Sequence, residues 1–376
     1  MGFHFNICRE DLLRAISTQQ NITNKKGTLA ILANILLQVE TDHIILTATD
    51  LEIGLKHVVP AEVFEKGTIT LPSKKLFELV RESGSNTLIF KEMDNQWVEI
   101  TAESSLYRLA GIKSDEFPQF PDYDENTMIS INGEIFSYLI DKTIFSIAQE
   151  KESMFTLNAA LLTKERENEK PFIKMISSDG HRLTIMTKEV DDSIYSLNMN
   201  EKTLIPRRGI QEIKKFCDNK DTFLFGIEKK QAVFKTKDSL LIVRLLDGDF
   251  PDFNGLLNSL SNDNPININR NRFIEGLKRI NLFTEDMFHA IKIDINENKM
   301  ILTSQNADFG SAKDEFDISY NGTHLSIGFN CRYFIESLQV MEGEIITANI
   351  KSNDSPCVIT SDEDEGFLSV IMPMKL

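Results

Sequence analysis

Residues 129–140 read ISINGEIFSYLI, a short strand-like stretch that leads directly into a helix-like one. Ile129 and Ile131 alternate with polar residues, which is the period of a strand with one buried face. After Gly133 the apolar residues recur at three- and four-residue spacing, which is typical of an amphipathic helix. This stretch therefore predicts a strand that is followed without a loop by a helix.

Similar stretches occur elsewhere in the 376-residue chain, at residues 5–16 (FNICREDLLRAI) and 266–277 (ININRNRFIEGL). A second set of three lies between them, at residues 70–82 (TLPSKKLFELVRE), 204–216 (LIPRRGIQEIKKF) and 326–340 (SIGFNCRYFIESLQV). The members of both sets follow one another at about 125 to 135 residues. Agreement between two independent sets indicates that the chain is built from three repeats.

Runs rich in Ile, Val, Thr and Phe fill the space between the predicted helices, for example residues 43–59, 231–246 and 299–309. Each repeat is thus predicted to hold two helices and about eight strands, an α+β unit of ordinary domain size. The Pro-punctuated stretch PQFPDYDENT and the polar stretch NSLSNDNP are candidate boundaries. The predicted domains are residues 1–127, 128–257 and 258–376.

The composition is that of a soluble globular protein, with 41% apolar and 26% charged residues. No apolar run is long enough for a membrane helix, and residues 1–11 lack the features of a signal peptide. The four cysteines are scattered and form no CxxC pair, which argues against a zinc knuckle and fits a reducing cytosol. We expect a cytoplasmic protein.

The net charge of −16 argues against nucleic-acid binding only if the charge is evenly spread. The six predicted helices together carry +6, which leaves −22 on the rest of the chain. Basic helix faces on an acidic protein suit a surface that meets phosphate, although Lys-rich helices also serve solubility alone. The candidate DNA contacts are Lys26, Lys74, Arg208, Lys214, Arg270, Lys278 and Arg279.

Helix geometry indicates how such faces could surround a duplex. Helices packed about 10 Å apart would, six to a circle, leave a hole of only about 10 Å. Twelve would leave about 28 Å, which exceeds the roughly 20 Å width of duplex DNA. A ring around DNA would therefore need two copies of this chain.

Four local motifs resemble those of the bacterial DNA polymerase III β subunit family, the sliding clamps. KGTLAILANILLQV and LTATDLEIG, at residues 26–39 and 46–54, are similar to the first-domain signature of that family. SDGHRLTIM at 178–186 and RLLDGDFPDF at 244–253 are similar to two central segments, and VIMPMKL at 370–376 to the usual C-terminal tail. All four occur in order across the whole chain.

The resemblance implies a non-catalytic subunit without cofactor or metal. It implies a head-to-tail homodimeric ring of six similar domains, with helices lining the pore and sheets outside. Such a ring encircles duplex DNA without regard to sequence and makes the replicative polymerase processive. The implied partners are polymerase subunits, the clamp loader and other proteins with clamp-binding peptides, in a bacterial cytoplasm and at the nucleoid during replication.

The resemblance also implies two contact sites. A partner-peptide pocket between the second and third domains would be formed by Leu157, Ser178, Gly180, His181, Arg182, Leu183, Pro251, Leu256, Phe288, Val370, Ile371, Met372, Pro373, Met374 and Leu376. A dimer interface would pair Tyr107 and Leu109 of one copy with Leu282 and Phe283 of the other. Most of the pocket residues are apolar, as a site for Leu and Phe anchors requires.

Three departures from the family pattern bear on these sites. Ala30 replaces a usual proline, which we expect to loosen a turn. Gly255 stands where many relatives have a basic residue beside the pocket, and residues 150–159 lack a common arginine. The glycine at position 255 is expected to weaken ligand contact beside the pocket.

Alternative functions are less well supported by the sequence. Ser178, Asp179 and His181 lie too close together along the chain to form a nucleophile, base and orienting acid, and no GxSxG motif accompanies them. The six histidines show no metal-ligand spacing. An oligomeric protein-binding scaffold that does not touch DNA remains the alternative, since it would share the repeats and the pocket.

Overall fold

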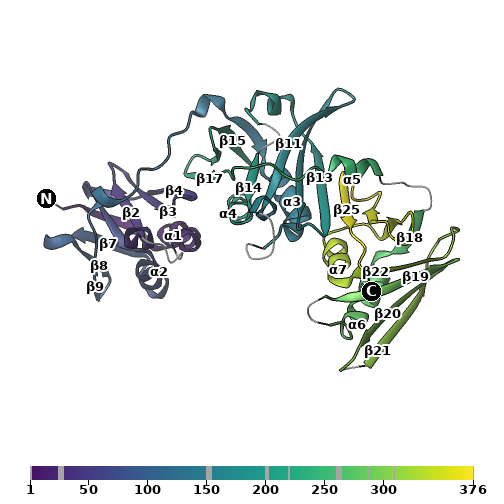
Figure 1. Ribbon diagram of the computed structural model, residues 1–376. Helices are drawn as coiled ribbons and strands as arrows, with labels where there is room; N and C mark the ends of the chain where they lie inside the picture. Colours follow the sequence, from purple (N-terminus) through teal and green to yellow (C-terminus); the bar gives the residue numbers. More distant parts are fainter. Residues whose placement is uncertain are drawn as a thin grey trace. The chain divides into compact units, whose positions relative to one another are not determined.

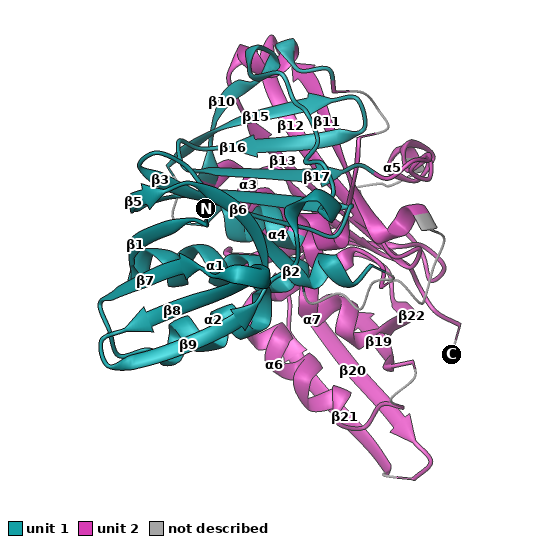
Figure 2. Ribbon diagram, turned by 90° about the vertical axis from the view of Figure 1, so that its left-hand side faces the viewer, with its two compact units in different colours: residues 1–133, 196–198, 211–245 teal, residues 134–195, 199–210, 246–376 magenta. Residues whose placement is uncertain are grey.

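The computed structural model describes residues 2–23, 29–149, 155–199, 203–218, 221–259, 265–285, 288–308 and 310–375. These residues form an α+β fold with four antiparallel sheets, as predicted. The chain divides into two compact units, coloured separately in Figure 2. Unit 1 comprises residues 1–133, 196–198 and 211–245, and unit 2 comprises residues 134–195, 199–210 and 246–376.

Unit 1 holds a five-stranded sheet of order β5-β1-β7-β8-β9 and an eight-stranded sheet of order β10-β15-β16-β17-β4-β3-β2-β6. The strands of the first are β1 (His4–Cys8), β5 (Glu62–Glu65), β7 (Thr87–Glu92), β8 (Trp97–Ala102) and β9 (Ser105–Ala110). Those of the second are β2 (Asn34–Val39), β3 (His43–Thr49), β4 (Ile53–Pro60), β6 (Gly67–Pro72), β10 (Ile129–Asn132), β15 (Thr222–Glu228), β16 (Gln231–Lys235) and β17 (Ser239–Arg244).

Unit 2 has the matching pair, an eight-stranded sheet of order β14-β11-β12-β13-β25-β24-β23-β18 and a four-stranded sheet of order β21-β20-β19-β22. The larger sheet contains β11 (Ala159–Glu167), β12 (Lys170–Ser178), β13 (Arg182–Glu189), β14 (Leu204–Pro206), β18 (Pro265–Asn269), β23 (Ile345–Asn349), β24 (Cys357–Thr360) and β25 (Phe367–Ile371). The smaller contains β19 (Ala290–Asn296), β20 (Lys299–Asn306), β21 (Gly310–Asp317) and β22 (Leu325–Asn330).

All six predicted helices are present, and their ends differ from the prediction by only a few residues at most places (Figure 1). They are α1 (Arg9–Thr23), α2 (Ser73–Glu82), α3 (Gly133–Thr143), α4 (Arg207–Cys217), α6 (Arg270–Asn281) and α7 (Cys331–Gln339). Each begins directly after a strand, and Asn269 and Asn330 cap α6 and α7 by accepting a backbone N–H. The prediction missed the short helix α5 (Asn254–Ser259), whose apolar residues are too few to show a period.

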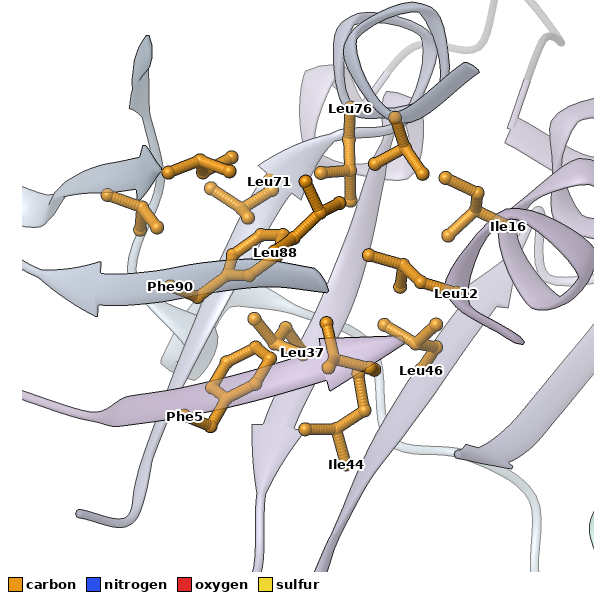
Figure 3. Packing of buried hydrophobic residues seen from close by; sticks show 14 of the residues in the cluster. Phe5, Leu12, Ile16, Leu37, Ile44, Leu46, Leu71, Leu76, Leu88 and Phe90 are labelled. Carbon is orange, nitrogen blue, oxygen red and sulfur yellow. The ribbon is translucent and has the colours of Figure 1, made fainter. Parts of the chain in front are cut away.

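The core of the first repeat shows why strand and helix alternate as they do. Apolar side chains from the inner faces of both sheets of unit 1 meet those of α1 and α2 (Figure 3). Phe5 and Phe90 stack with ring centroids 4.9 Å apart on neighbouring strands, and Leu12 of α1 and Leu76 of α2 belong to the same buried cluster. Full burial of such side chains contributes about 1.5–3 kcal/mol each.

The threefold repeat is visible at the level of single residues. Shortly after each of β9, β17 and β25 ends, one residue forms an isolated bridge to a strand that precedes a helix. In all three cases this residue lies seven positions after the first residue of the strand. These bridges are Thr70 with Ile112, Leu204 with Leu246, and Gly328 with Met374. The predicted repeats are therefore confirmed in structure.

Each eight-stranded sheet combines strands of two successive repeats. In unit 1, β17 pairs with β4, from Ser239 opposite His57 to Val243 opposite Ile53. We call this pairing the first joint. In unit 2, β25 pairs with β13 in the same manner, from Phe367 opposite Met186 to Ile371 opposite Arg182, and we call it the second joint.

Candidate functional site

A cavity of about 220 Å³ lies over the second joint, within unit 2. Its volume is below the range of about 300–1,000 Å³ that is usual for small-molecule sites, so it suits one or two side chains of a peptide. Sheet residues form its floor and the segment from Phe250 to Leu256 forms one wall. The lining residues are Leu157, Ser178, Gly180, Arg182, Leu183, Phe250, Pro251, Asp252, Phe253, Leu256, Val370 and Met372.

The wall is built by the FPDF sequence and the helix that follows it. The rings of Phe250 and Phe253 meet edge to face, with centroids 6.2 Å apart. Asp252 Oδ1 accepts the backbone N–H of Asn254 at 2.9 Å and so starts α5. Leu256 then packs on the buried core cluster that contains Leu183 of the sheet. An apolar wall is thereby held against an apolar floor.

The floor begins at a tight turn before β13. Asp179 Oδ1 accepts the N–H groups of His181 and Arg182, at 2.9 and 3.1 Å. Gly180 between them has a φ of 90°, a conformation that glycine adopts without strain. Ser178 Oγ donates to the carbonyl oxygen of Arg182 at 2.6 Å. Ser178 and Asp179 therefore serve the turn, which supports the rejection of a hydrolase site.

Arg182 is buried beneath the cavity and its donors are engaged on three sides. Nε donates to Asp179 at 2.9 Å, Nη1 to Glu336 at 2.6 Å and Nη2 to the carbonyl oxygen of Phe145 at 2.8 Å. Its guanidinium also lies 4.5 Å from the ring centroid of Tyr333. The residue thus ties β13 to α7 and is poorly placed to offer a charge to a ligand.

Nine of the fifteen predicted pocket residues line this cavity: Leu157, Ser178, Gly180, Arg182, Leu183, Pro251, Leu256, Val370 and Met372. His181 is exposed and stacks on Tyr333, with centroids 6.5 Å apart. Phe288 is 49% exposed and is not among the lining residues. Leu376 lies outside the described residues.

The C-terminal tail contributes less to the cavity than predicted. Ile371 is fully buried and Pro373 does not line the cavity. Met374 donates its N–H to the carbonyl oxygen of Gly328 at 2.7 Å, which fixes it to β22. The prediction of a freed tail overlooked this bridge, which holds the chain immediately beyond Pro373. Val370 and Met372 are the described tail residues that line the cavity, and the N–H of Met372 donates to the carbonyl oxygen of His181 at 2.9 Å.

Three lining residues were not predicted, Phe250, Asp252 and Phe253. All belong to the RLLDGDFPDF motif, from which only Pro251 was selected. The alternation of aromatic residues around Pro251 could have identified them, because such a short segment must fold its two rings onto the nearest apolar surface.

A buried ion pair lies behind the second joint. Lys142 Nζ on α3 contacts Asp364 Oδ1 at 2.7 Å, and the two side chains are 3% and 0% exposed. Asp364 also accepts the N–H groups of Glu342 and Gly343 at 3.0 Å. Burial alone would raise the pKa of Asp364, but these hydrogen bonds, above all that from Lys142, hold it below its usual value. The pair connects α3 to the turn that precedes β25.

The residues predicted to contact DNA differ in exposure and in the contacts that they already make within the protein. Lys74 and Lys278 are exposed on α2 and α6. Lys214 pairs with Asp218 at 3.3 Å, and Arg208 is also engaged by other groups. Lys26 lies outside the described residues.

Two arginines of α6 are held by the protein. Arg270 donates to the carbonyl oxygens of Gly343 and Leu338, at 2.7 and 3.1 Å. Arg279 contacts Asp314 at 2.7 Å, and Arg272 shares that carboxylate. Burial alone would raise the pKa of Asp314, but the two guanidinium groups hold it below its usual value. The formal charge of α6 therefore overstates what it can offer to phosphate.

The residues predicted at a dimer interface lie on outer strands or helix ends. Tyr107 is 37% exposed on β9, the last strand of its sheet, and Leu109 beside it is half-buried. Leu282, at the end of α6, is 75% exposed, and Phe283 is half-buried. All four thus keep apolar surface that this chain alone does not fully cover.

Family models match nearly the whole chain. Those of the N-terminal, central and C-terminal domains of the DNA polymerase III beta subunit match residues 3–121, 130–252 and 261–375. The chain belongs to the DNA polymerase III beta subunit family.

Individual beta subunits agree along their full length. The protein named Beta sliding clamp from Chlamydia pneumoniae is 29% identical over 372 residues, which is 99% of either chain. The crystal structure of the beta subunit from Pseudomonas aeruginosa is 26% identical, with a TM-score of 0.91 over 99% of this chain and 100% of that one. A Pseudomonas aeruginosa sliding clamp bound to griselimycin is 25% identical, with a TM-score of 0.89 and full coverage of both chains.

Other predicted features of this beta subunit can be located in the structure. Ala30, in place of the usual proline, is exposed and begins a short 3₁₀ helix, Ala30–Ala33. Gly255 is exposed in the first turn of α5. Within the described part of the chain, no group of three or more potential ligands could hold a metal ion, and no helix is long and apolar enough to cross a membrane.

Proposed function

We propose that this chain is a DNA sliding clamp, a non-catalytic ring that two copies form around duplex DNA and that tethers replication proteins. The observation that carries the proposal is that strands of successive repeats pair with each other at the first and second joints. Each repeat completes its sheet with a strand from the next, and one strand at either end of the series is left without such a partner. A second copy of the chain can supply both.

The strand pairs at the two joints indicate which strands lack a partner from a neighbouring repeat. β17 of the second repeat pairs with β4 of the first, and β25 of the third pairs with β13 of the second. By the same rule, β9 of the first repeat should pair with β21 of the third. Both are outermost strands of their sheets. Pairing each β9 with the β21 of the other copy gives a head-to-tail dimer that closes.

The turn before each joint predicts the register of this contact. Asp50 and Asp179 each accept the N–H of the residue two positions on, and the residue seven positions on lies opposite the first residue of the pairing strand. Asn306 accepts the N–H of Asp308 in the same way, at 2.9 Å. Lys313 is therefore expected opposite Ser105 of the other copy.

The dimer also covers the four apolar residues that were predicted at this interface, Tyr107, Leu109, Leu282 and Phe283. Replacing Leu282 and Phe283 together by alanine should yield monomers in sedimentation velocity. The double variant Leu51→Ala and Phe64→Ala, whose side chains are 54% and 52% exposed elsewhere in unit 1, is the matched control. A Leu282 and Phe283 variant that stays dimeric below micromolar concentration would exclude this interface.

DNA contact is proposed to come from mobile cations on the helices. Lys74 and Lys278 are the strongest candidates because both are exposed, while Arg208 and Lys214 remain candidates with partners of their own. Arg270 and Arg279 are proposed to hold α6 in place. Changing Lys74 and Lys278 to Gln should lower the dependence of DNA loading on salt concentration, because each phosphate contact releases counterions.

The decisive test of the clamp function is topological. The full chain, loaded by a clamp loader onto nicked circular DNA, should remain bound and should be lost when the circle is cut. Retention on linear DNA would indicate ordinary binding, and indifference to DNA would indicate the protein-only scaffold. The proposed location of the protein is the bacterial cytoplasm. The chain is proposed to form three domains, near residues 1–127, 128–257 and 258–376.

The pocket over the second joint is proposed to bind the clamp-binding peptides of polymerase subunits, the clamp loader and other partners. Its support is the apolar lining, which suits Leu and Phe anchors. Deleting Met372–Leu376 should weaken binding of a peptide with these anchors by roughly ten- to a hundredfold. Undiminished affinity, measured by fluorescence anisotropy, would show that the partners dock elsewhere.

A further inference from the structure

The lining of the pocket leaves little to distinguish one apolar peptide from another except charge. Most of its floor and wall is aliphatic or aromatic, the hydroxyl of Ser178 is used within its own turn, and such surfaces accept any anchor of suitable size. Two of its lining residues carry a formal charge, Arg182 and Asp252. Discrimination between partners therefore depends on what these two offer to a ligand.

Arg182 offers little. It is 7% exposed, and its guanidinium already donates to two carboxylates and a carbonyl oxygen. The carboxylates compensate its charge at close range, so an acidic group on a peptide would gain little from it.

Asp252 is in the opposite situation. It is exposed, and its one hydrogen bond within the described part of the chain is the N–H of Asn254, which Oδ1 accepts. No described Lys or Arg forms an ion pair with it. Its carboxylate therefore keeps its charge uncompensated at the edge of an apolar cavity, where a ligand cation can reach it.

Gly255 is the position on this wall where a basic side chain could stand beside Asp252, and the glycine carries no charge. It lies between Asp252 and Leu256, both of which line the cavity, and a Cβ at this position would meet nothing within 4 Å. A longer side chain would have room here. With glycine at this position, α5 offers no cation to the carboxylate of Asp252.

We propose that Asp252 makes the pocket select peptides that carry a Lys or Arg next to their apolar anchors over peptides that carry Asp or Glu there. This inference rests on the proposed function of the pocket and names the chemistry of its preferred partners. An exposed pair of this kind contributes modestly, so the preference should be about two- to fivefold in dissociation constant at low salt.

The experiment uses the full chain and short synthetic peptides with one Leu and one Phe anchor, flanked on either side by Lys, Gln or Glu. Fluorescence anisotropy gives the ratio of dissociation constants for the Glu- and Lys-flanked peptides. The wild type should bind the Lys-flanked peptide more tightly, and the ratio should shrink towards one as salt is raised.

Two variants locate the effect. Asp252→Asn removes the charge but keeps the oxygen that caps α5, so it should abolish the preference. Gly255→Arg should reverse it, whereas Gly255→Ala, its matched control, should retain it. Glu297→Gln, an equal change of charge in an exposed turn between β19 and β20, should also leave the preference as in the wild type.

The outcomes separate this inference from the proposed function. Peptides that bind with affinities independent of their flanks would overturn the role of Asp252 and leave the pocket as the docking site. A preference that persists in Asp252→Asn would do the same. Failure of every peptide to bind the wild type would overturn both.

Discussion

The two joints have the same architecture, but different side chains cover them. Each joint pairs strands of successive repeats over five residues, next to an Asp that caps a tight turn. Each is crossed by a connector with an FPxF sequence, FPQF at residues 117–120 and FPDF at 250–253. In unit 2 this arrangement leaves a cavity. In unit 1 the connector lies directly on the sheet.

One equivalent position differs clearly in size between the two joints. Gly54 and Leu183 occupy equivalent places, each four residues after the capping Asp. A Cβ at Gly54 would lie 2.7 Å from Cε2 of Phe120, so the ring of Phe120 rests on the backbone of the first joint. At the second joint the side chain of Leu183 occupies the equivalent position and lines the cavity with Phe253.

The comparison teaches that one repeated scaffold can carry different side chains at equivalent floor positions, a glycine under Phe120 at the first joint and Leu183 beside a cavity at the second. The two joints also differ in the interactions that stabilise them. The first is covered by Phe120, Tyr123 and Met128, which pack on the buried cluster of the sheet. The second is backed by buried charges, Lys142 with Asp364. These two sets of interactions should respond differently to mutation.

The largest expected effect is at the buried charges. Lys142→Met leaves Asp364 buried without its cation, which should lower the free energy of unfolding by about 3–5 kcal/mol. Urea unfolding followed by circular dichroism measures the change. Lys170→Met, which breaks an exposed pair with Glu189, is the control and should cost less than about 1 kcal/mol.

A double variant tests whether the loss comes from the uncompensated charge. Lys142→Met combined with Asp364→Asn should recover part of the stability, because the amide oxygen of Asn can still accept the N–H groups of Glu342 and Gly343 and no uncompensated charge is left buried. A single variant that costs no more than Lys170→Met would remove the distinction drawn between the joints.

The apolar packing at the first joint should give a smaller effect. Gly54→Ala forces Phe120 off the sheet and should lower the free energy of unfolding by about 1–3 kcal/mol. With Phe120→Ala already present, the same change should cost at least about 1 kcal/mol less, since the two positions are in contact. Gly84→Ala, where a Cβ meets nothing within 4 Å, should be nearly neutral. Additive costs would show that Phe120 does not rest on Gly54.

The contribution of the tail to the second joint can be tested with two methionines. Met372→Ala removes a lining side chain and should raise the dissociation constant of a Leu- and Phe-anchored peptide about five- to tenfold. Met374 is bridged to Gly328 outside the cavity, so Met374→Ala should change the constant less than about twofold. Equal effects would mean that the whole tail acts as one wall, as the sequence alone suggested.

The smallest expected effect is a difference in pH dependence. Because the pKa of Asp364 is lowered in the folded chain, its stabilisation is present above the unfolded value of about 4 and is lost as the pH falls through the folded pKa. Asp364→Asn should therefore lose less stability than the wild type between neutral pH and pH 3. Identical acid limbs in urea titrations at successive pH values would show that Asp364 does not contribute.

The sequence was sufficient for the repeats and the helices but not for the details of the pocket. Periodicity located α1 to α4, α6 and α7, because each buries one face against a sheet. Residues such as Leu183 and Met372 were found by resemblance to the family. The bridge of Met374 and the engagement of Arg270 could not be predicted, since both depend on backbone carbonyls that only the folded chain brings close.

Two of the outermost strands, β9 and β21, also create a hazard for the single chain. An uncovered strand edge can pair with any other exposed edge. β21 reads GSAKDEFD and is net acidic, so two such strands repel each other. β9 reads SLYRLA, and its one charge, Arg108, is paired with Glu99. Of these two strands, β9 is therefore the more open to misassociation, and the pairing proposed above would cover it.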